Sequence, residues 1–359
     1  MYKKFDELFI DETRYGTKIK TDQYLSEGKY PIVDQGQKKI SGYTDIEDGI
    51  FKEVPAIIFG DHTRLIKYID APFFIGADGV KIIRSRLKEI NYKYLYYALL
   101  NVSIPNTGYN RHFKWLKETK IYYPDSEKQK YIVEVLDKIS LIIEKKNKQI
   151  EQWDFLLKSL FIEMFGDISD QENVEVSRIC KLITDGTHQP PKFEESGIPF
   201  LFVSNIVTNN ITYDTEKFIS EETYKELIKR TPIEIGDLLL STVGSYGHSA
   251  IVKFAKRFCF QRHIAYLKPK SEIVDSEYFR SAILSDNVQR QIHSCVRGIA
   301  QKTLNLSEIR KLCIPLPPMV QQQQFANIVR GIDKSKLAVK KSLEELEILK
   351  KSLMQKYFA

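Results

Sequence analysis

Cysteine is scarce in this sequence, and long apolar runs are missing from it. Its four cysteines, Cys180, Cys259, Cys295 and Cys313, form no C-x-x-C pair, which excludes a zinc knuckle and a redox-active dithiol motif. We expect them to be reduced, buried thiols of a cytoplasmic protein. No apolar run approaches the roughly 18 residues that span a bilayer. Residues 1–7 also carry no apolar segment, so we expect no secretory signal there.

Signatures of catalysis are missing as well. The sequence has no phosphate-binding G-x-x-x-x-G-K-[ST] loop and no dinucleotide-binding G-x-G-x-x-G. The stretch 244–249 lacks the spacing of a nucleophile elbow, and no Asn-Pro-Pro-aromatic tetrad of an amino-methyltransferase is present. The six histidines show no metal-ligand spacing. We therefore expect no catalytic residue and no metal site in this chain.

The charge of the chain is modest and evenly distributed. Its 54 basic and 47 acidic side chains give a net charge of +7, without a basic tail or a block of one sign. Such a balance permits binding to nucleic acid but does not require it. The length of 359 residues and the apolar content of 43% suffice for about two to three domains with separate cores.

An internal repeat organises the chain. Residues 121–165 align without a gap to residues 314–358, and 11 of the 45 positions are identical, among them Gln129 with Gln322. In each copy a proline precedes apolar residues that recur in steps of three and four, which predicts one helix of about 40 residues. Each apolar stripe would be exposed on a lone helix, so we expect the two helices to pair. The predicted seam includes Ile139, Trp153, Leu157, Ile332, Leu343 and Leu346.

A globular segment precedes each long helix, and the two segments share a faint pattern. Each contains an apolar strand after a turn, then a second strand and a short aromatic helix. The predicted strands are 55–59, 73–83, 236–240 and 258–267, and the predicted short helices are 92–100 and 278–284. We therefore expect mixed α/β (α+β) domains at 1–120 and 166–313, and long helices at 121–165 and 314–359.

Several motifs together resemble those of one family, the specificity subunits of type I restriction–modification systems. The strongest is Asp-Gly-Thr-His-Gln-Pro-Pro at 185–191. The others are Gly-Ile-Pro-Phe-Leu at 197–201, Val-Ser-Asn-Ile at 203–206, the stretches 236–244 and 314–318, and the glutamines 321–324. In the first half, 29–37 and 75–80 resemble another branch of the family, although Tyr-Tyr-Pro at 122–124 departs from the usual exit.

The resemblance implies a fold and a function. Each globular segment would be a target recognition domain that reads one half of a split, asymmetric DNA sequence, and the long helices would form an antiparallel coiled coil that sets the spacer. Two modification subunits and two restriction subunits would join this non-catalytic chain. The assembled complex would be a DNA adenine methyltransferase and an ATP-dependent endonuclease for phage defence. S-adenosylmethionine, ATP and Mg²⁺ would be bound by those partners, with no cofactor in this chain.

Polar loop residues are the candidates for contact with double-stranded DNA. Arginine or lysine suits guanine in the major groove, and asparagine or glutamine suits adenine. In the first domain the candidates are Gln35, Gln37, Lys38, Lys39, His62, Arg64, Asn106, Tyr109, Asn110 and Arg111. In the second domain they are Thr187, His188, Lys192, Asn205, Ser245, Tyr246, Gln261, Arg262, Arg297, Gln301 and Lys302.

Two other classes of function compete with DNA recognition. The first is a non-DNA-binding coiled-coil scaffold, in which the two globular heads hold other proteins. The second is an enzyme with its own DNA chemistry, for which Pro124-Asp125 followed by Glu144-Lys145-Lys146 would have to form a nuclease site. Those residues lie along a predicted helix, where Glu and Lys normally form a solvated face. The missing catalytic motifs also weigh against an enzyme.

Overall fold

The computed structural model describes residues 1–76, 78–88, 90–108, 110–166, 173–298 and 302–358. These residues form two compact units. The first unit comprises residues 1–147 and 341–359, and the second comprises residues 148–340. The boundaries divide each long helix, so each unit contains a globular part and one section of both helices.

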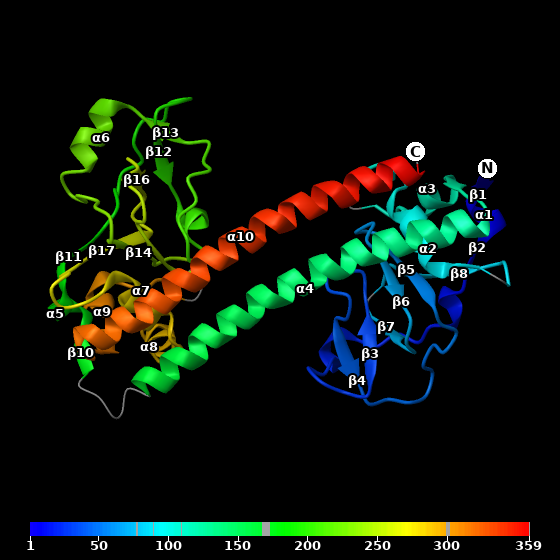
Figure 1. Cartoon of the computed structure of the whole chain (residues 1–359), viewed down its shortest axis with the longest axis horizontal. Helices are drawn as coiled ribbons and strands as arrows, with labels where there is room; N and C mark the ends of the chain where they lie inside the picture. The colour runs from blue at the N-terminus through cyan, green and yellow to red at the C-terminus, as the bar shows by residue number, and fades with distance from the viewer. Residues whose placement is uncertain (77, 89, 109, 167–172, 299–301, 359) are drawn as a thin grey trace. The chain divides into compact units, whose positions relative to one another are not determined.

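The first unit contains a four-stranded, a three-stranded and a two-stranded sheet, the last formed by β1 and β9 (Figure 1). A four-stranded antiparallel sheet has the order β2-β8-β5-β6, and a three-stranded sheet has the order β4-β3-β7, in which β3 and β7 are parallel. The strands are β1 (Tyr2–Lys4), β2 (Phe9–Asp11), β3 (Tyr30–Val33), β4 (Gly42–Thr44), β5 (Ala56–Gly60), β6 (Ile66–Ile69), β7 (Phe74–Ile75), β8 (Val80–Ser85) and β9 (Lys120–Tyr122). The helices before the coil are α1 (Phe5–Leu8), α2 (Tyr92–Leu100) and α3 (Phe113–Lys117), with 3₁₀ turns η1 (Thr13–Tyr15) and η2 (Thr21–Gln23).

The second unit repeats this topology strand for strand. Its sheets have the orders β11-β17-β14-β15 and β13-β12-β16, and β12 is parallel to β16. The strands are β10 (Asn173–Glu175), β11 (Cys180–Asp185), β12 (Ile198–Leu201), β13 (Phe218–Ile219), β14 (Leu238–Ser241), β15 (Ser249–Ile251), β16 (Cys259–Phe260), β17 (Ile264–Pro269) and β18 (Cys313–Pro315). The helices before the coil are α5 (Val176–Ile179), α6 (Glu221–Leu227), α7 (Ser276–Leu284), α8 (Asp286–Cys295) and α9 (Leu306–Lys311), with the 3₁₀ turn η4 (Val203–Asn205).

Most of the predicted elements appear at their expected places. The exceptions are the strands predicted at 73–83 and 258–267, each of which is two strands in different sheets, β7 and β8 in the first unit and β16 and β17 in the second. The apolar strands predicted at 55–59 and 236–240 are β5 and β14, and the predicted short helices are α2 and α7. The two long helices are α4 (Ser126–Phe165) and α10 (Met319–Phe358), each 40 residues long. The mixed helix-and-strand fold class is therefore confirmed.

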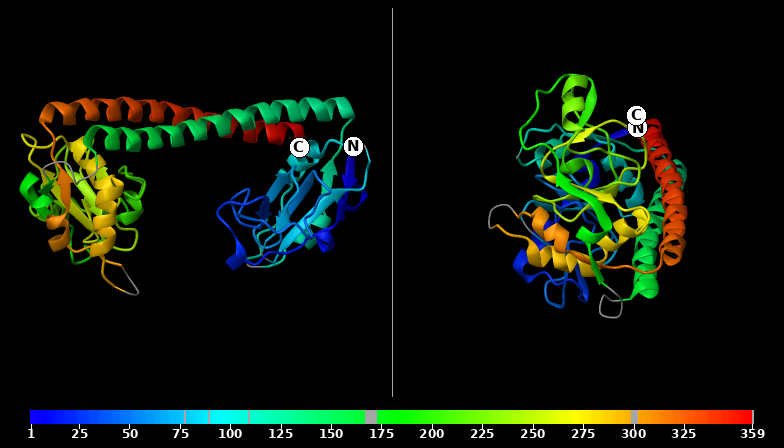
Figure 2. Two further views of the ribbon diagram at one scale, coloured as in Figure 1. Left: turned by 90° about the horizontal axis from the view of Figure 1, so that it is seen from below. Right: turned by 90° about the vertical axis from the view of Figure 1, so that its left-hand side faces the viewer.

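The long helices pack against each other in opposite directions. In the first unit, Leu136 near the start of α4 belongs to the same apolar cluster as Phe358 at the end of α10. In the second unit, Phe165 at the end of α4 lies 5.5 Å from Phe325 near the start of α10, measured between ring centroids. Figure 2 shows the two ribbons side by side. The pairing is thus antiparallel, as expected.

The predicted seam has the right phase but is less deeply buried than expected. Ile139 and Leu343 are buried, with exposures of 7% and 9%. The other four seam residues are only half-buried: Trp153, Leu157, Ile332 and Leu346. A pair of helices covers each seam residue from one side only. Full burial is therefore reached where a globular part also covers the helix, as at Leu136.

In each unit two equivalent side chains, a tyrosine and a glutamine, bind the segment that leads into the long helix. The buried Tyr94 of α2 donates a 2.6 Å hydrogen bond to the carbonyl oxygen of Tyr122, and Tyr278 of α7 donates one of 2.7 Å to that of Pro315. Gln129 and Gln322, the identical pair of the repeat, each donate to the carbonyl of the proline that precedes the helix, Pro124 and Pro317. These bonds explain why the repeat retains a buried glutamine.

The cysteines depart from the expectation in part. All four are free, but only Cys180 and Cys259 are buried, whereas Cys295 and Cys313 are half-buried. Burial raises the pKa of the Cys180 and Cys259 thiols to about 12. Cys295 and Cys313 lie near the end of α8 and at β18, where the edges of the domain leave them partly accessible. The expectation that all four are buried is therefore wrong for these two.

Candidate nucleic-acid interface

In the first unit, polar loops meet where β5 ends and β8 begins, which we call the first loop end. Gln35, from the loop after β3, joins three of them. Its amide nitrogen donates to the carbonyl of Asp78 at 2.8 Å, and its amide oxygen accepts from the backbone of His62 at 3.2 Å. Thr63 donates its hydroxyl to the Gln35 carbonyl at 2.7 Å. The side chain of Gln35 therefore orders the loops, with its polar groups used within the unit.

A buried histidine attaches a further loop to the first loop end. The backbone of His112 donates to the Asp61 carbonyl at 2.8 Å, and the ring nitrogen Nδ1 lies 3.0 Å from the same oxygen. The other ring nitrogen, Nε2, lies 3.3 Å from the Thr107 hydroxyl. His112 is fully buried. It therefore secures the segment that carries the exposed candidates Asn106, Asn110 and Arg111.

A buried lysine holds the loop after β3. Lys67 of β6 is 7% exposed and donates to the carbonyls of Asp34 and Lys38 at 2.7 and 2.5 Å. Burial is the main cause of its lowered pKa. The loop so held carries the candidates Gln37, Lys38 and Lys39. Arg64 has a left-handed backbone, with φ of 62°, and its guanidinium lies 3.4 Å from the Ile104 carbonyl.

The second unit gathers its polar loops at the equivalent place, where β14 ends and β17 begins, which we call the second loop end. Thr187 forms a bridge with Gln261 and accepts from the backbone of Arg262 at 3.0 Å. Tyr246 shares a 2.7 Å hydrogen bond with His293. The candidates brought together here are Thr187, His188, Ser245, Tyr246, Gln261, Arg262, Arg297 and Lys302.

The two loop ends are joined by equivalent backbone bonds. In the first unit, Asp61 donates to Gly79 at 2.7 Å and accepts from His112. In the second unit, Thr242 donates to His263 at 3.0 Å and accepts from Leu304 at 2.8 Å. In both units the residue that follows the central strand, β5 or β14, bonds to the loop before β8 or β17. It also bonds to the segment before α3 or α9. The same frame thus carries two different sets of polar side chains.

Asn205 is a correction to the list of candidates. It is buried, with 5% exposure, and its amide oxygen accepts from the backbone of Phe202 at 2.9 Å. Its amide nitrogen donates to the Asp214 carbonyl at 2.8 Å. The structure thus gives Asn205 a role inside the domain in place of a base contact. Phe202 and Asp214 are only three and nine residues from Asn205, but the burial that gives it this role depends on the fold.

Three other candidates lie away from the second loop end or outside the described residues. Lys192 is 87% exposed and pairs with Glu194 at 3.6 Å, beside the β12 and β13 segment. Tyr109 and Gln301 lie outside the described residues. Conversely, Arg230 was not among the candidates, yet it contacts Asp185 at the second loop end. No local pattern marks Arg230, because its partner is 45 residues away in the sequence.

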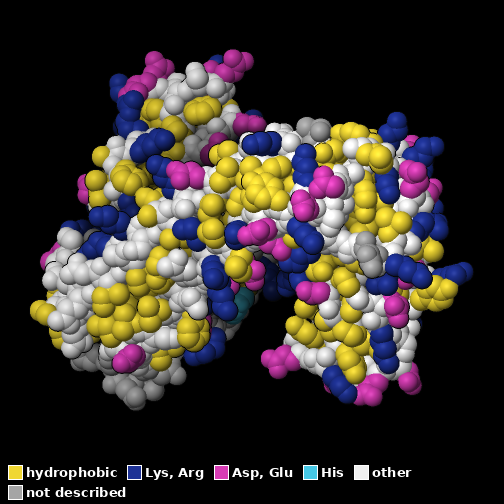
Figure 3. Space-filling model, turned by 45° about the vertical axis from the view of Figure 1, so that its right-hand side comes forward, with side chains coloured by type: hydrophobic (Ala, Val, Ile, Leu, Met, Phe, Trp, Pro, Cys, Tyr) yellow, Lys and Arg dark blue, Asp and Glu magenta, His cyan; other side chains and the backbone are white. Residues whose placement is uncertain are grey.

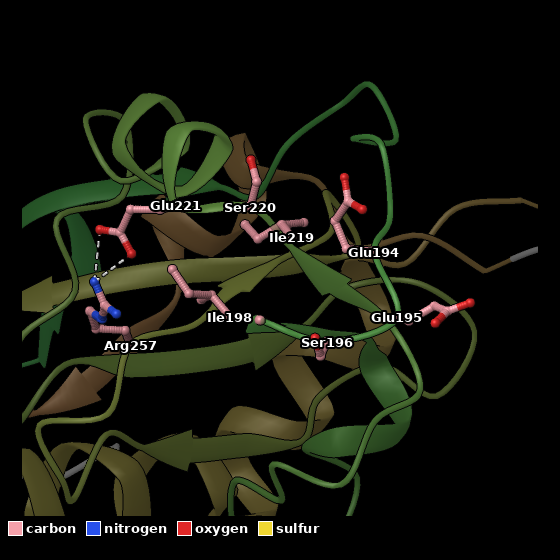
Figure 4. Close-up of a pocket in the computed structure, with 9 residues that line it drawn as sticks. Glu194, Glu195, Ser196, Ile198, Ile219, Ser220, Glu221 and Arg257 are labelled. Carbon is pink, nitrogen blue, oxygen red and sulfur yellow. Dashed lines mark hydrogen bonds and ion pairs between the residues drawn. The ribbon is translucent and has the colours of Figure 1, made fainter.

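A cleft beside β12 and β13 does not suit a nucleic acid. It has a volume of about 730 Å³ and is lined by Glu194, Glu195, Glu221 and Arg257, among others (Figure 4). Arg257 already pairs with both carboxylate oxygens of Glu221, at 2.8 and 2.9 Å. The remaining carboxylates would repel phosphate. We therefore place the candidate interface at the loop ends.

Three further observations concern surface charge, metal ligands and membrane-spanning helices. On the face drawn in Figure 3, Lys and Arg side chains are interspersed with Asp and Glu and form no single basic field. Across the part of the chain that the structure describes, no group of three or more His, Cys, Asp or Glu could hold a metal ion. Over the same residues, no helix has the length and apolarity needed to cross a membrane.

The chain contains two copies of one α/β frame. Each copy has polar loops gathered at one end and is fixed to a long helix. This arrangement is that of a two-headed recognition protein. The type I restriction modification DNA specificity domain matches this chain twice, at residues 2–152 and 168–348. Because these matches cover most of the chain, it belongs to that family, as a type I specificity subunit with two target recognition domains. The resemblance found in the sequence is confirmed.

Individual relatives agree with this assignment. The specificity subunit of the type I restriction enzyme MjaVIII from Methanocaldococcus jannaschii is 24% identical over 317 residues, which cover 78% of this chain and 74% of that protein. The crystal structure of the type I restriction–modification S subunit from M. genitalium is 19% identical, with a TM-score of 0.60 over 100% of this chain and 96% of that one. A chain from a study of complex assembly in the type I system is 14% identical, with a TM-score of 0.53 over 99% of this chain and 97% of that one. The two structures show that the fold is shared.

Proposed function

We propose that each target recognition domain reads one half of a bipartite, asymmetric DNA sequence through its loop end. The observation that carries this proposal is the repetition of one frame with different polar side chains. Arg262 and Gln261 occupy the second loop end, whereas Arg64, Asn110 and Arg111 lie at or near the first. Two similar frames can approach a duplex in equivalent ways, and different side chains then select different bases.

In this proposal the long helices act as spacer and docking surface. The domains would comprise residues 1–120 and 166–313, joined by the helices of 121–165 and 314–359. Two modification subunits would bind the coiled coil and supply the methyltransferase, with S-adenosylmethionine as their cofactor. Two restriction subunits would supply ATP- and Mg²⁺-dependent cleavage. This chain would do no chemistry itself and would work in the cytoplasm.

A gel-shift experiment with the modification subunits present tests the proposal. We expect the complex to shift duplexes that contain the host's methylated motif at least 10³-fold more tightly than scrambled duplexes, the lower end of the usual specificity range. A complex that forms with the modification subunits but shows no sequence preference would favour the alternative, a non-DNA-binding coiled-coil scaffold. Substituting loop residues such as Arg262 should weaken binding without releasing the modification subunits.

A further inference from the structure

The strongest motif of the sequence, residues 185–188, surrounds a carboxylate that is nearly buried. Asp185 ends β11, and its side chain is 14% exposed. One carboxylate oxygen, Oδ2, lies 2.9 Å from Nε2 of His188, and the other, Oδ1, accepts a hydrogen bond from the guanidinium of Arg230. Both oxygens of Asp185 are therefore occupied by side chains of the second loop end.

The glycine of the motif places this carboxylate beside the loop between β16 and β17. A Cβ atom on Gly186 would lie 2.1 Å from the Phe260 carbonyl oxygen and 2.5 Å from that of Gln261. Those atoms belong to the backbone, so no side chain fits at Gly186. The close approach allows the backbone of Thr187 to donate to Phe260 at 3.2 Å. Asp185 is thus held next to the segment that carries the candidates Gln261 and Arg262.

Arg230 reaches this carboxylate from a distant part of the chain. It follows α6 in a turn in which its backbone donates to Leu227 at 3.2 Å. Its side chain is 53% exposed, so the guanidinium stays accessible to a ligand after it has bound Asp185. A guanidinium has five donor groups in one plane, and the bond from one of its nitrogens to Asp185 restricts its orientation. Fixing it in advance lowers the entropy lost when the guanidinium binds.

We propose that Arg230 is a specificity-determining residue that reads a guanine in the half-site of the second domain. Two parallel donors of arginine match the O6 and N7 atoms of guanine in the major groove. The paired carboxylate of Asp185 offsets the charge of Arg230, which weakens its general attraction to phosphates but keeps its directed donors. This arrangement therefore suits a base edge better than the DNA backbone. The proposal rests on the proposed function, that the second domain reads DNA.

Arg230→Lys tests the proposal, because lysine keeps the charge but loses the planar pair of donors. The complex with modification subunits is incubated with duplexes randomised in both half-sites, and the bound fraction is sequenced. We expect the preference for guanine at one position of the second half-site to fall about ten- to a hundredfold. The first half-site should be unchanged. Lys229→Gln is the matched control, because Lys229 is an exposed neighbouring cation, and it should leave both half-sites intact.

A salt titration separates base reading from phosphate binding. The slope of log K against log salt should stay the same in Arg230→Lys and in Arg230→Gln, since a base contact releases no counterion. If Arg230→Gln instead lowers affinity equally for all sequences and reduces the slope by about one, Arg230 binds a phosphate and the proposal is wrong. If wild-type and Arg230→Gln complexes select the same bipartite motif, the proposal is also wrong. A wild-type complex with no preference would instead overturn the proposed function.

Asp185→Asn tests whether the carboxylate acts through Arg230. We expect Asp185→Asn to relax the same base position, and the double variant with Arg230→Lys to be no worse than Arg230→Lys alone. Losses that multiply would show that Asp185 does not position Arg230. An intact first half-site in the selected duplexes shows that each variant complex is folded and assembled. If Asp185→Asn does not assemble, Arg230→Lys and Arg230→Gln alone decide the proposal.

Discussion

Buried polar side chains in the two domains hold exposed loop residues in place. His112 is completely buried, and both of its ring nitrogens lie within hydrogen-bond distance of loop atoms, of Asp61 and Thr107. Gln35 and Lys67 bind neighbouring loops in the same way. A buried polar group without its partner costs about 1–3 kcal/mol. These side chains therefore couple the stability of a domain to the shape of its loop end.

His112→Ala should disturb the first loop end alone. The change removes the ring that contacts the Asp61 carbonyl and the Thr107 hydroxyl, and leaves a cavity, so we expect a loss of about 2–4 kcal/mol in unfolding free energy. In the selected duplexes, the first half-site should lose sequence preference while the second keeps it. Equal relaxation of both half-sites would contradict a local role for His112. Denaturant unfolding and sequencing of bound duplexes provide the two measurements.

Asp237 should give the second domain a specific pH dependence. Burial is the main cause of its raised pKa, opposed by hydrogen bonds from the Tyr266 hydroxyl and the Glu234 backbone and by Lys268. Because the folded pKa lies above the ordinary 3.8, the folded chain holds this proton to higher pH than the unfolded chain does. The contribution of Asp237 to the unfolding free energy therefore falls as the pH rises from about 4.

Asp237→Asn removes that loss of stability. Relative to the wild type, the unfolding free energy of the variant should increase between pH 4 and pH 7, because asparagine does not ionise. Urea titrations of both proteins across this range measure the difference. A difference that stays constant with pH would show that Asp237 ionises in the folded domain as easily as in the unfolded chain.

At the scale of elements, a cluster of charges joins α7 to α10 in the second unit. Glu277 and Arg280 of α7 are nearly buried, with side chains 8% and 9% exposed, and pair at 3.2 Å. Asp333 of α10 lies 3.6 Å from Arg280 and 2.8 Å from Lys253. Removing one member of a buried ion pair leaves the other charge without compensation, which is more costly than losing a surface pair.

Arg280→Met should therefore destabilise the second unit by about 1–3 kcal/mol, because the nearly buried Glu277 would keep only Lys253, at 3.3 Å, and Asp333 would lose its contact with Arg280. Arg330→Met is the matched control. Arg330 is 47% exposed and lies 3.6 Å from Asp275, so its loss should cost about 0–1 kcal/mol. Denaturant unfolding of both variants provides the comparison. Equal costs for the two arginines would contradict the claim that the α7–α10 cluster fixes the domain to the helix.

The elements themselves could be predicted from the sequence, but the contacts that orient them could not. Apolar spacing and the 193-residue repeat located α4 and α10, because a helix periodicity is written in neighbouring residues. By contrast, Arg230 and Asp185 are 45 residues apart, and Lys253 and Asp333 are 80 apart. Pairings of this kind depend on the fold. Asn205 was a candidate reader of adenine for a different reason: its partners are three and nine residues away, but its burial is set by the fold and not by the local pattern.

At the scale of the whole molecule, the proposed function implies that the length of the two paired helices sets the spacer between the half-sites. The units divide α4 between residues 147 and 148 and α10 between residues 340 and 341. Four residues inserted at both points leave the contacts within each unit intact and add about 6 Å of helix. At about 3.4 Å per base pair, the spacer of the methylated motif should lengthen by one or two base pairs. Both half-sites should stay the same. The control is an insertion in α4 alone, which breaks the pairing between α4 and α10. An unchanged spacer with full activity would show that the coiled coil does not set the spacer.

The most direct test of the central claim is the methylated motif of cells that express this chain with its modification subunits. Methylation-sensitive sequencing reads that motif from genomic DNA. We expect one bipartite motif with two different half-sites and a fixed spacer, and we expect it to disappear when this chain is omitted. Exchanging residues 170–310 for those of another family member should replace one half-site and leave the other half-site and the spacer unchanged. A continuous or palindromic motif, or a motif that persists without this chain, would contradict the account.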